Sequence, residues 1–270
     1  MSTVRYTHGH HESVLRSHRT RTAENSAGYL LHHLRSGLDV LDVGSGPGTI
    51  TAELAELVAP GTMTAVENTD AALDLTRAEL TARGIGNASF AVADVQALSF
   101  DDDTFDVVHA HQVLQHLGDP VGALREMGRV CRPGGIVAVR DADYRAFSWF
   151  PEVPELDEWL ALYRAVARSN GAEPDAGRRL LSWALAAGFD PGQIEPTASV
   201  WLYADPAGRA DWGGMWADRV LASSFADQAV ASGRAGRDDL QRISDAWRRW
   251  AAAPDGWLLV PHGELVIRVA

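Results

Sequence analysis

The sequence contains no lysine, a single cysteine and no apolar run long enough to cross a bilayer. Its 24 strongly basic side chains are therefore all arginines, and with 36 acidic residues the formal net charge is −12. Because nucleic acids and anionic membranes are bound by clustered positive charge, the composition argues against both as partners. The lone Cys131 excludes a disulfide framework and any metal site with several cysteine ligands.

The first twelve residues are polar and rich in histidine, without the apolar core of a secretion signal, so we expect a cytoplasmic protein. His8, His10 and His11 are close in sequence, but no cysteine or suitably spaced carboxylate accompanies them, and we expect no metal site. A chain of 270 residues, 46% of them hydrophobic, is long enough for one domain with elaborations.

Short apolar runs alternate with helical patterns over the first half of the chain. The expected strands are 39–43, 63–67, 89–93, 105–110 and 136–140. Five strands alternating with four helices predict a parallel, doubly wound α/β sheet. The second half departs from this rhythm, because a mostly helical stretch at 206–253 separates two further strand-like runs.

A glycine turn, Gly44-Ser45-Gly46-Pro47-Gly48, follows the first strand, and a helix is expected to open at Pro47. Glycine omits the side chain where a backbone must bend sharply or let a ligand come close. Such a turn at the carboxyl end of a strand is where open α/β sheets bind their ligands. The spacing differs from the dinucleotide fingerprint G-x-G-x-x-G, since position 49 is threonine.

Two acidic residues end the next two strands. Glu67 lies 23 positions after Gly44, near the spacing of about 20 at which a carboxylate takes a ribose hydroxyl pair. Asp94 falls beside the place an adenine would occupy, and a carboxylate accepts from the adenine amino group. The alternative is that both are loop carboxylates in water.

The segments LDVGSGPGT, AVEN, ADV, FDVVHAHQVLQHLGDP and RVCRPGGIVAV occur in this order over residues 38–140. Together they resemble a class I S-adenosylmethionine-dependent methyltransferase, in particular the ubiquinone/menaquinone-biosynthesis-type group acting on small molecules. The resemblance implies a Rossmann-like, doubly wound seven-stranded sheet with an antiparallel last hairpin, here 198–203 with 264–269. We expect a single domain over 1–270, with an N-terminal helical arm (1–37) and helical lid segments (144–175 and 206–253). The second segment, inserted before the last strand, departs from the family, in which the hairpin connection is often short.

By the same resemblance the cofactor is S-adenosylmethionine and the product S-adenosylhomocysteine. Residues implied around the cofactor are Tyr6, Gly44, Ser45, Gly46, Glu67, Asn68, Asp94, Val95 and His111. Glu67 takes the ribose hydroxyls with Asn68 over the adenine, while Asp94 and the backbone of Val95 read the adenine edge. The His111 carbonyl approaches the methionine end. Tyr6 and one arginine of the arm (Arg16, Arg19 or Arg21) are expected partners of the methionine carboxylate.

Methyl transfer from a sulfonium is an in-line displacement, so the protein must align the two reactants and remove a proton where the nucleophile carries one. His116 is the expected general base because histidine titrates near neutrality, with Gln115 beside it. The alternative for His116 is a hydrogen-bonded histidine at a helix start. Asp141 and Asp143, which leave the fifth strand, are second candidates for catalysis or ordinary loop residues.

The acceptor is expected to be a small, apolar or aromatic molecule, because aromatic side chains line such sites. Candidate substrate residues are Tyr144, Trp201, Trp212 and Trp216. For the insert at 206–253, a packing role is the alternative to a lid. A nicotinamide-dependent oxidoreductase and a non-catalytic cofactor-binding subunit remain alternative functions. The oligomeric state stays open, with a homodimer among the alternatives.

Overall fold

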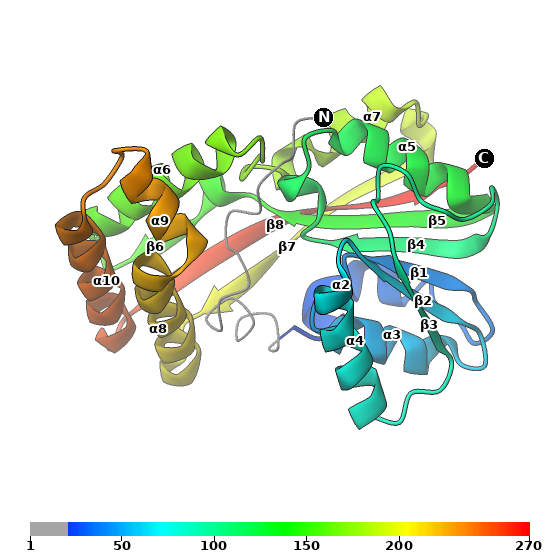
Figure 1. The fold of residues 1–270 in the computed structure, drawn as a ribbon, viewed down its shortest axis with the longest axis horizontal. Helices are drawn as coiled ribbons and strands as arrows, with labels where there is room; N and C mark the ends of the chain where they lie inside the picture. The colour runs from blue at the N-terminus through cyan, green and yellow to red at the C-terminus, as the bar shows by residue number, and fades with distance from the viewer. Residues whose placement is uncertain (1–20) are drawn as a thin grey trace.

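The computed structural model describes residues 21–270. One mixed sheet runs through the molecule in the order β3-β2-β1-β4-β5-β8-β6, and β7 pairs with β8 (Figure 1). Its strands are β1 Val40–Val43, β2 Met63–Glu67, β3 Ala88–Val92, β4 Phe105–His111, β5 Cys131–Ala142, β6 Ser148–Phe150, β7 Ile194–Tyr203 and β8 Trp257–Arg268. The first five strands are parallel and the last hairpin is antiparallel, which confirms the predicted architecture.

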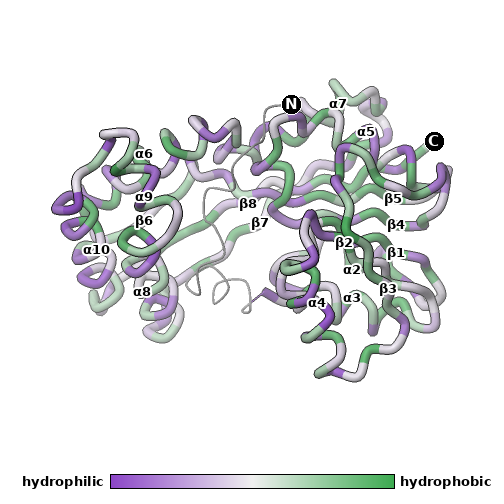
Figure 2. The backbone as a smooth tube through the Cα atoms, viewed as in Figure 1, coloured by the Kyte–Doolittle hydropathy of each residue, from purple (hydrophilic) through white to green (hydrophobic). Residues whose placement is uncertain are grey.

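Helices cover both faces of the parallel part of the sheet, with α5 and α7 on one face and α2, α3 and α4 on the other (Figure 1). The helices are α2 Ala23–Leu31, α3 Thr49–Val58, α4 Asp70–Ala82, α5 Pro120–Val130, α6 Pro154–Ser169, α7 Leu180–Ala187, α8 Pro206–Ala222, α9 Ser224–Ala231 and α10 Arg237–Ala252. The central strands are mostly hydrophobic, as expected for strands buried on both faces (Figure 2). Within residues 21–270, no helix combines the length and apolarity needed to cross a membrane.

The hairpin strands are longer than predicted, and their pairing differs. Residues 198–203 pair with 263–258, while 264–267 pair with 197–194. Pro196 and Pro261 lie inside the paired strands, although proline cannot donate to a ladder. Along β8, the pairing with β5 ends at His262 and the pairing with β6 begins at Leu259. Pro261 lies between these two ladders, where its carbonyl accepts from the Asp143 N–H and no N–H of its own is needed.

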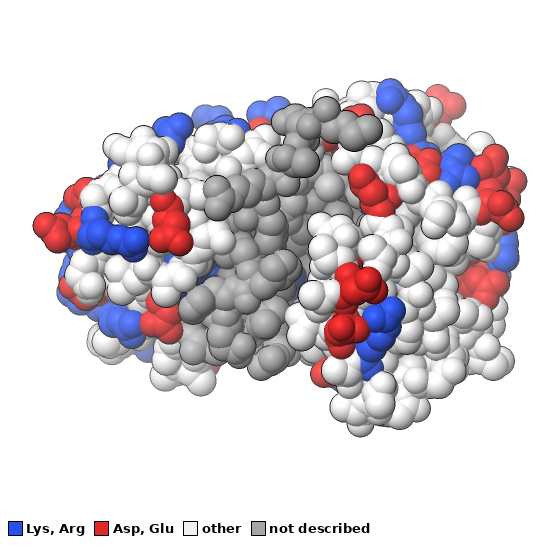
Figure 3. Space-filling view, in the orientation of Figure 1, with Lys and Arg blue, Asp and Glu red and all other residues white. Residues whose placement is uncertain are grey.

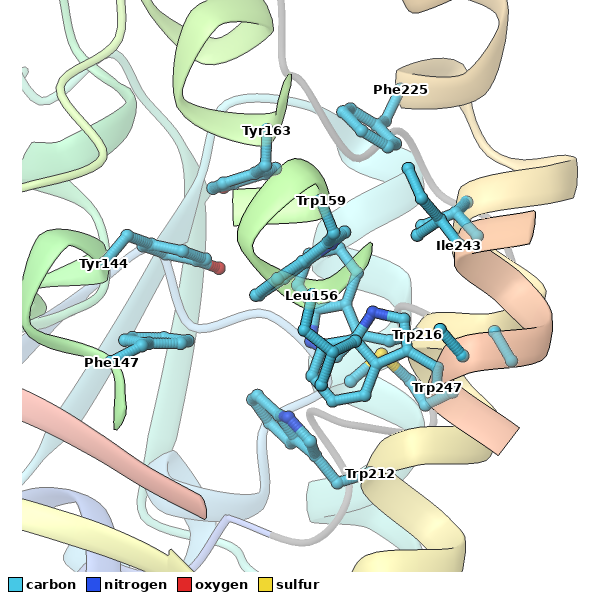
Figure 4. Packing of buried hydrophobic residues seen from close by; sticks show 14 of the residues in the cluster. Tyr144, Phe147, Leu156, Trp159, Tyr163, Trp212, Trp216, Phe225, Ile243 and Trp247 are labelled. Atoms are coloured by element: carbon cyan, nitrogen blue, oxygen red, sulfur yellow. The ribbon is translucent and has the colours of Figure 1, made fainter. Parts of the chain in front are cut away.

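Helices α6, α8, α9 and α10 gather with β6 around the far ends of β7 and β8, at the left of Figure 1. They share one apolar core, shown in Figure 4, in which the Trp159 ring lies 4.5 Å from Trp216 and 4.8 Å from Trp247 between centroids. Edge-to-face contacts of this kind add to the burial of large apolar surfaces. The segments 144–175 and 206–253 therefore build a single helical lobe. The first was expected to be helical, but it also contributes the short strand β6, which pairs with β8.

We predict that this lobe depends on its core. Leu156 is fully buried, so Leu156→Ala should lower the free energy of unfolding by about 2–5 kcal/mol. Leu185 on α7 is 43% exposed, and the matched variant Leu185→Ala should change the free energy of unfolding by less than about 1 kcal/mol. Urea unfolding of the three proteins checks this, and equal losses in both variants would contradict the assignment of Leu156 to the core.

Candidate cofactor and acceptor site

The glycine turn after β1 is shaped by three residues with positive φ: Gly44 (70°), Gly46 (56°) and Gly48 (85°). A Cβ on Gly44 would lie 2.5 Å from a methyl group of Val113, so this glycine lets the turn contact the segment that follows β4. A Cβ on Gly46 would meet no atom of residues 21–270 within 4 Å. Within this part of the chain, the Gly46 backbone therefore faces open space at the carboxyl edge of the sheet.

The helix after the turn does not open at Pro47, as the sequence suggested, but at Thr49. Gly48 is the N-cap residue, and its left-handed backbone cannot belong to an α-helix. A Cβ at Gly48 would lie 2.9 Å from the Cα of Thr76 on α4, which explains why glycine is needed there. The Thr76 hydroxyl donates to the Gly46 carbonyl at 2.7 Å and holds the turn from behind.

Glu67 stands at the end of β2, beside the turn. Its Oε1 accepts the Gly46 N–H at 2.8 Å, and its Oε2 accepts the Asn68 N–H at 3.2 Å. These two bonds fix the carboxylate next to the glycines, as the ribose assignment requires. Asn68 is exposed, and the Thr69 side chain caps helix α4.

Asp94 follows β3 and is exposed, with Oδ1 accepting the Gln96 N–H at 2.9 Å. The Val95 side chain is buried in the core beside it, so only the backbone of this residue is presented to a ligand. Because β1, β2 and β3 are parallel neighbours, the turn, Glu67 and Asp94 lie along one edge of the sheet. The predicted cofactor residues of the described chain are thus brought together. Their roles stay predictions.

Beyond β4 the chain makes an unusual turn at Gln112, whose φ of 55° is uncommon for a residue other than glycine. The Gln112 side chain accepts from Arg21 Nη2 through Oε1 at 2.9 Å and contacts His262 Nε2 through Nε2 at 2.9 Å. Strained backbone of this kind is concentrated at functional sites. In the sequence, Gln112 is a weaker candidate than its neighbour His111 for the methionine end, and nothing singles out His262.

Arg21 reaches the middle of this region. Its guanidinium carbon lies 5.6 Å from the centre of the Trp201 ring. Burial lowers the pKa of both His111 and His116, and the charge of Arg21 lowers it further. Of the three arginines expected to bind the methionine carboxylate, Arg21 is the one whose position the structure describes. Tyr6, Arg16, Arg19 and the histidines at 8, 10 and 11 lie outside the described residues.

His116 ends the short 3₁₀ helix η1 (Leu114–His116), with its Nε2 3.3 Å from Nε2 of Gln115. Burial, and to a smaller extent Arg21, lowers the pKa of His116 to about 4. The imidazole is therefore neutral at physiological pH. It can accept a proton, but with such a low pKa it is a weak base. Its catalytic role stays a prediction.

Asp141 is completely buried near the end of β5. Its Oδ1 accepts the Gln115 N–H at 3.1 Å, and burial raises its pKa to about 8. At neutral pH the Asp141 carboxyl is therefore mostly protonated. This favours a structural role, in which Asp141 holds η1 in place, over a role as a general base. Asp143 accepts from Arg178 Nε at 2.7 Å, an ion pair that binds the β5 end to the segment before α7.

The candidate substrate residues occupy different depths. Trp201 is partly buried on β7, and its ring centroid lies 4.4 Å from that of His262. Trp212 is buried against Tyr203, with ring centroids 4.5 Å apart, and its indole N–H has no hydrogen-bond partner among the described residues. Trp216 is fully buried in the core of the helical lobe, so packing, the alternative to a lid, explains its position (Figure 4).

Tyr144 lies two residues after the end of β5, and its ring centroid is 4.3 Å from that of Tyr163 on α6. It belongs to the junction between the sheet and the helical lobe, where Figure 4 shows it at the edge of the aromatic cluster. The visible surface around the two parts carries acidic and arginine side chains intermixed, without a single basic patch (Figure 3).

Comparisons with known proteins identify the family. A family model described as a methyltransferase domain matches residues 34–188, more than half of the chain. An uncharacterised methyltransferase of Schizosaccharomyces pombe is 35% identical over 97% of this chain and 96% of its own length. The ubiquinone/menaquinone biosynthesis C-methyltransferase of Idiomarina loihiensis is 34% identical over 58% of this chain and 68% of its own. A putative methyltransferase of Bacillus halodurans, 18% identical, has a similar fold, with a TM-score of 0.57 over 90% of this chain and 98% of that one.

The protein belongs to the class I S-adenosylmethionine-dependent methyltransferases. It is an enzyme whose cofactor is S-adenosylmethionine. The nicotinamide-dependent alternative is thereby removed. The acceptor is a separate question, because one fold supports many reactions.

Because the folded-state pKa of His116 lies below the ordinary 6.5, the unfolded chain binds more protons between pH 6.5 and about 4. The free energy of unfolding should therefore fall as the pH is lowered, and His116 alone should contribute roughly 2 kcal/mol of that loss by pH 5. His116→Gln should reduce the difference in stability between pH 7 and pH 5, measured by urea unfolding. An unchanged difference in His116→Gln would contradict the burial of a neutral imidazole.

Proposed function

We propose that the protein methylates a small, apolar or aromatic metabolite, which it holds between the carboxyl ends of β4 and β5 and the helical lobe. The observation that carries this proposal is the arrangement around the glycine turn. An open backbone at Gly46, a fixed carboxylate at Glu67 and a second at Asp94 follow one another along the sheet edge.

The residues present fit the cofactor. Gly46 leaves room for a ligand at the turn, and the two carboxylates accept from groups that donate, as ribose hydroxyls and the adenine amino group do. When bound, S-adenosylmethionine supplies the electrophilic methyl group. The Gly44–Gly46 backbone would hold its methionine part, Glu67 its ribose and Asp94 its adenine, and the His111 carbonyl would lie near the methyl end.

The chain's own contribution to the reaction is alignment and exclusion of water. The segment after β4 is held against the glycine turn by the Gly44–Val113 contact and by Asp141 below η1. Gln115 and His116 on this segment would face the acceptor. Where the nucleophile of the methyl acceptor carries a proton, the neutral His116 would remove it, as a weak base because burial lowers its pKa.

The helical lobe would close the acceptor side. Trp212 lies where α8 meets β7, with its ring 4.5 Å from that of Tyr203 and 6.4 Å from that of Trp201 between centroids, so it is the tryptophan of α8 that we place toward a ligand. Trp216, one turn further along the helix, holds the lobe together. The lid role proposed for the insert thus rests on Trp212.

The first test is cofactor affinity. Glu67→Ala would lose charge-assisted hydrogen bonds to both ribose hydroxyls, each contributing about 1.5–3 kcal/mol, so the affinity for S-adenosylmethionine should fall at least tenfold. Asp70→Ala removes an acid three positions along whose side chain is 81% exposed, and it should bind like the wild type. Isothermal titration calorimetry checks both. Unchanged affinity in a folded Glu67→Ala protein would refute the placement of the ribose.

The second test concerns the lid. Trp212→Ala should raise the Michaelis constant for the acceptor at least several-fold, because an apolar wall is removed, and should leave cofactor affinity unchanged. Trp183→Ala, a partly buried tryptophan on α7, is the control and should leave both unchanged. The measurement uses an acceptor found by screening with labelled cofactor. Wild-type acceptor kinetics in Trp212→Ala would contradict the lid.

A further inference from the structure

The loop at 170–176 connects helix α6 of the helical lobe to the segment that leads into α7, and it is bonded to the candidate site on the way. The Glu173 N–H donates to the Gln115 carbonyl at 2.9 Å. The Pro174 carbonyl accepts from the Tyr144 N–H at 3.1 Å. The loop is therefore attached both to η1 and to the segment that follows β5.

The backbone of Gln115 is held from two sides. Its N–H donates to Asp141 Oδ1 at 3.1 Å, and its carbonyl accepts from Glu173. Gln115 is 4% exposed and directly precedes His116. The 3₁₀ helix η1 has only three residues and no side-chain cap at its start, so it has too few bonds of its own to be stable. Its position depends on β5 on one side and on the loop on the other.

Asp175 organises the loop. It is 3% exposed, and its Oδ1 accepts from the Arg145 N–H and from Arg164 Nε, each at 3.0 Å. Its Oδ2 accepts from Arg164 Nη2 at 2.6 Å and from Arg168 Nη2 at 2.5 Å. Its own N–H donates to Glu173 Oε1 at 3.0 Å, next to the bond that reaches η1. Charge-assisted bonds of this kind fix geometry as well as adding stability.

The Asp175 carboxyl is ionised at physiological pH. Burial alone would raise its pKa, but the hydrogen bonds and charges of Arg164 and Arg168 outweigh burial and hold the pKa below its ordinary value. Both arginines belong to α6, whereas Asp175 belongs to the loop that is bonded to Gln115. This buried anion therefore links the helical lobe to η1, and removing it leaves the two guanidinium groups without the partner that they share.

We propose that Asp175 is a positioning residue for methyl transfer. It fixes the loop to α6, and the bond from the loop to the Gln115 carbonyl then sets η1 relative to the helical lobe. The inference rests on the proposed function, in which the lobe holds the acceptor while Gln115 and His116 face it. Asp175 itself touches neither reactant. Its effect on the rate is through alignment, where an error of about 1 Å can cost roughly 100-fold.

Hydrogen exchange tests the link without an acceptor. In Asp175→Ala, the Glu173 amide should exchange at least about tenfold faster than in the wild type, because its bond to Gln115 opens more often. Asp175→Asn keeps an oxygen for the Arg145 N–H and should restore part of the protection. The control Asp227→Ala breaks an exposed ion pair with Arg237 in the same lobe and should leave the Glu173 amide unchanged.

Unchanged exchange at Glu173 in a folded Asp175→Ala protein would overturn the proposal. If Asp175→Ala does not fold, Arg164→Met takes its place, because it removes two of the four bonds to Asp175 from the side of α6. The same criterion then applies to the exchange of the Glu173 amide.

Kinetics separate positioning from a purely structural role, with an acceptor found by screening with labelled cofactor. In Asp175→Ala, kcat should fall by about 10- to 100-fold, while the Michaelis constant for the acceptor and the affinity for S-adenosylhomocysteine change less than about threefold. Leu240→Ala opens the lobe core at a fully buried position on α10 without removing a bond to the loop, and it should keep kcat within about threefold of the wild type.

Equal falls of kcat in Asp175→Ala and Leu240→Ala would reduce Asp175 to a structural residue and overturn the proposal. Failure of the wild-type protein to bind S-adenosylhomocysteine would instead refute the proposed function. The exchange experiment distinguishes these outcomes, since it reports on the bond between Glu173 and Gln115 whatever the protein methylates.

Discussion

The close approach of the turn after β1 to the segment after β4 is the constraint on which the site depends. It exists because Gly44 carries no side chain, since a Cβ would lie 2.5 Å from Val113. The contact sets the glycine turn, Glu67 and the Gln112–His116 segment along the same edge of the sheet. Any cofactor bound at the turn therefore lies next to the histidines that end β4 and form η1.

The long β7–β8 hairpin extends this edge into a second lobe. One half of β8 pairs with β5 in the main sheet, and the other half pairs with β6 in the helical lobe. The buried pair of Arg140 and Glu264, bonded also to Ser199 of β7, ties the hairpin to the sheet at this junction. Breaking such a pair is costly because a buried charge is left alone, so the position of the lobe relative to the strand ends is well defined.

The sequence predicted the parallel sheet, its strand ends and the residues placed there, because buried parallel strands read as apolar runs and glycines mark the turns between them. It misplaced the start of α3, since the left-handed backbone of Gly48 depends on contact with Thr76 of α4. It shortened the hairpin, because the gap that tolerates Pro261 is visible only in three dimensions. His262 was overlooked for the same reason, although His262 and Glu264, two positions apart between the apolar runs of β8, were a usable signal.

The central claim is that the cofactor lies along the glycine turn with its methyl end toward the segment after β4. A crystal structure with S-adenosylhomocysteine bound tests this most directly. We expect both ribose hydroxyls within hydrogen-bonding distance of Glu67, the adenine amino group at Asp94 and the sulfur facing the Gln112–His116 segment. A nucleoside bound elsewhere, or bound with its ribose away from Glu67, would contradict the account.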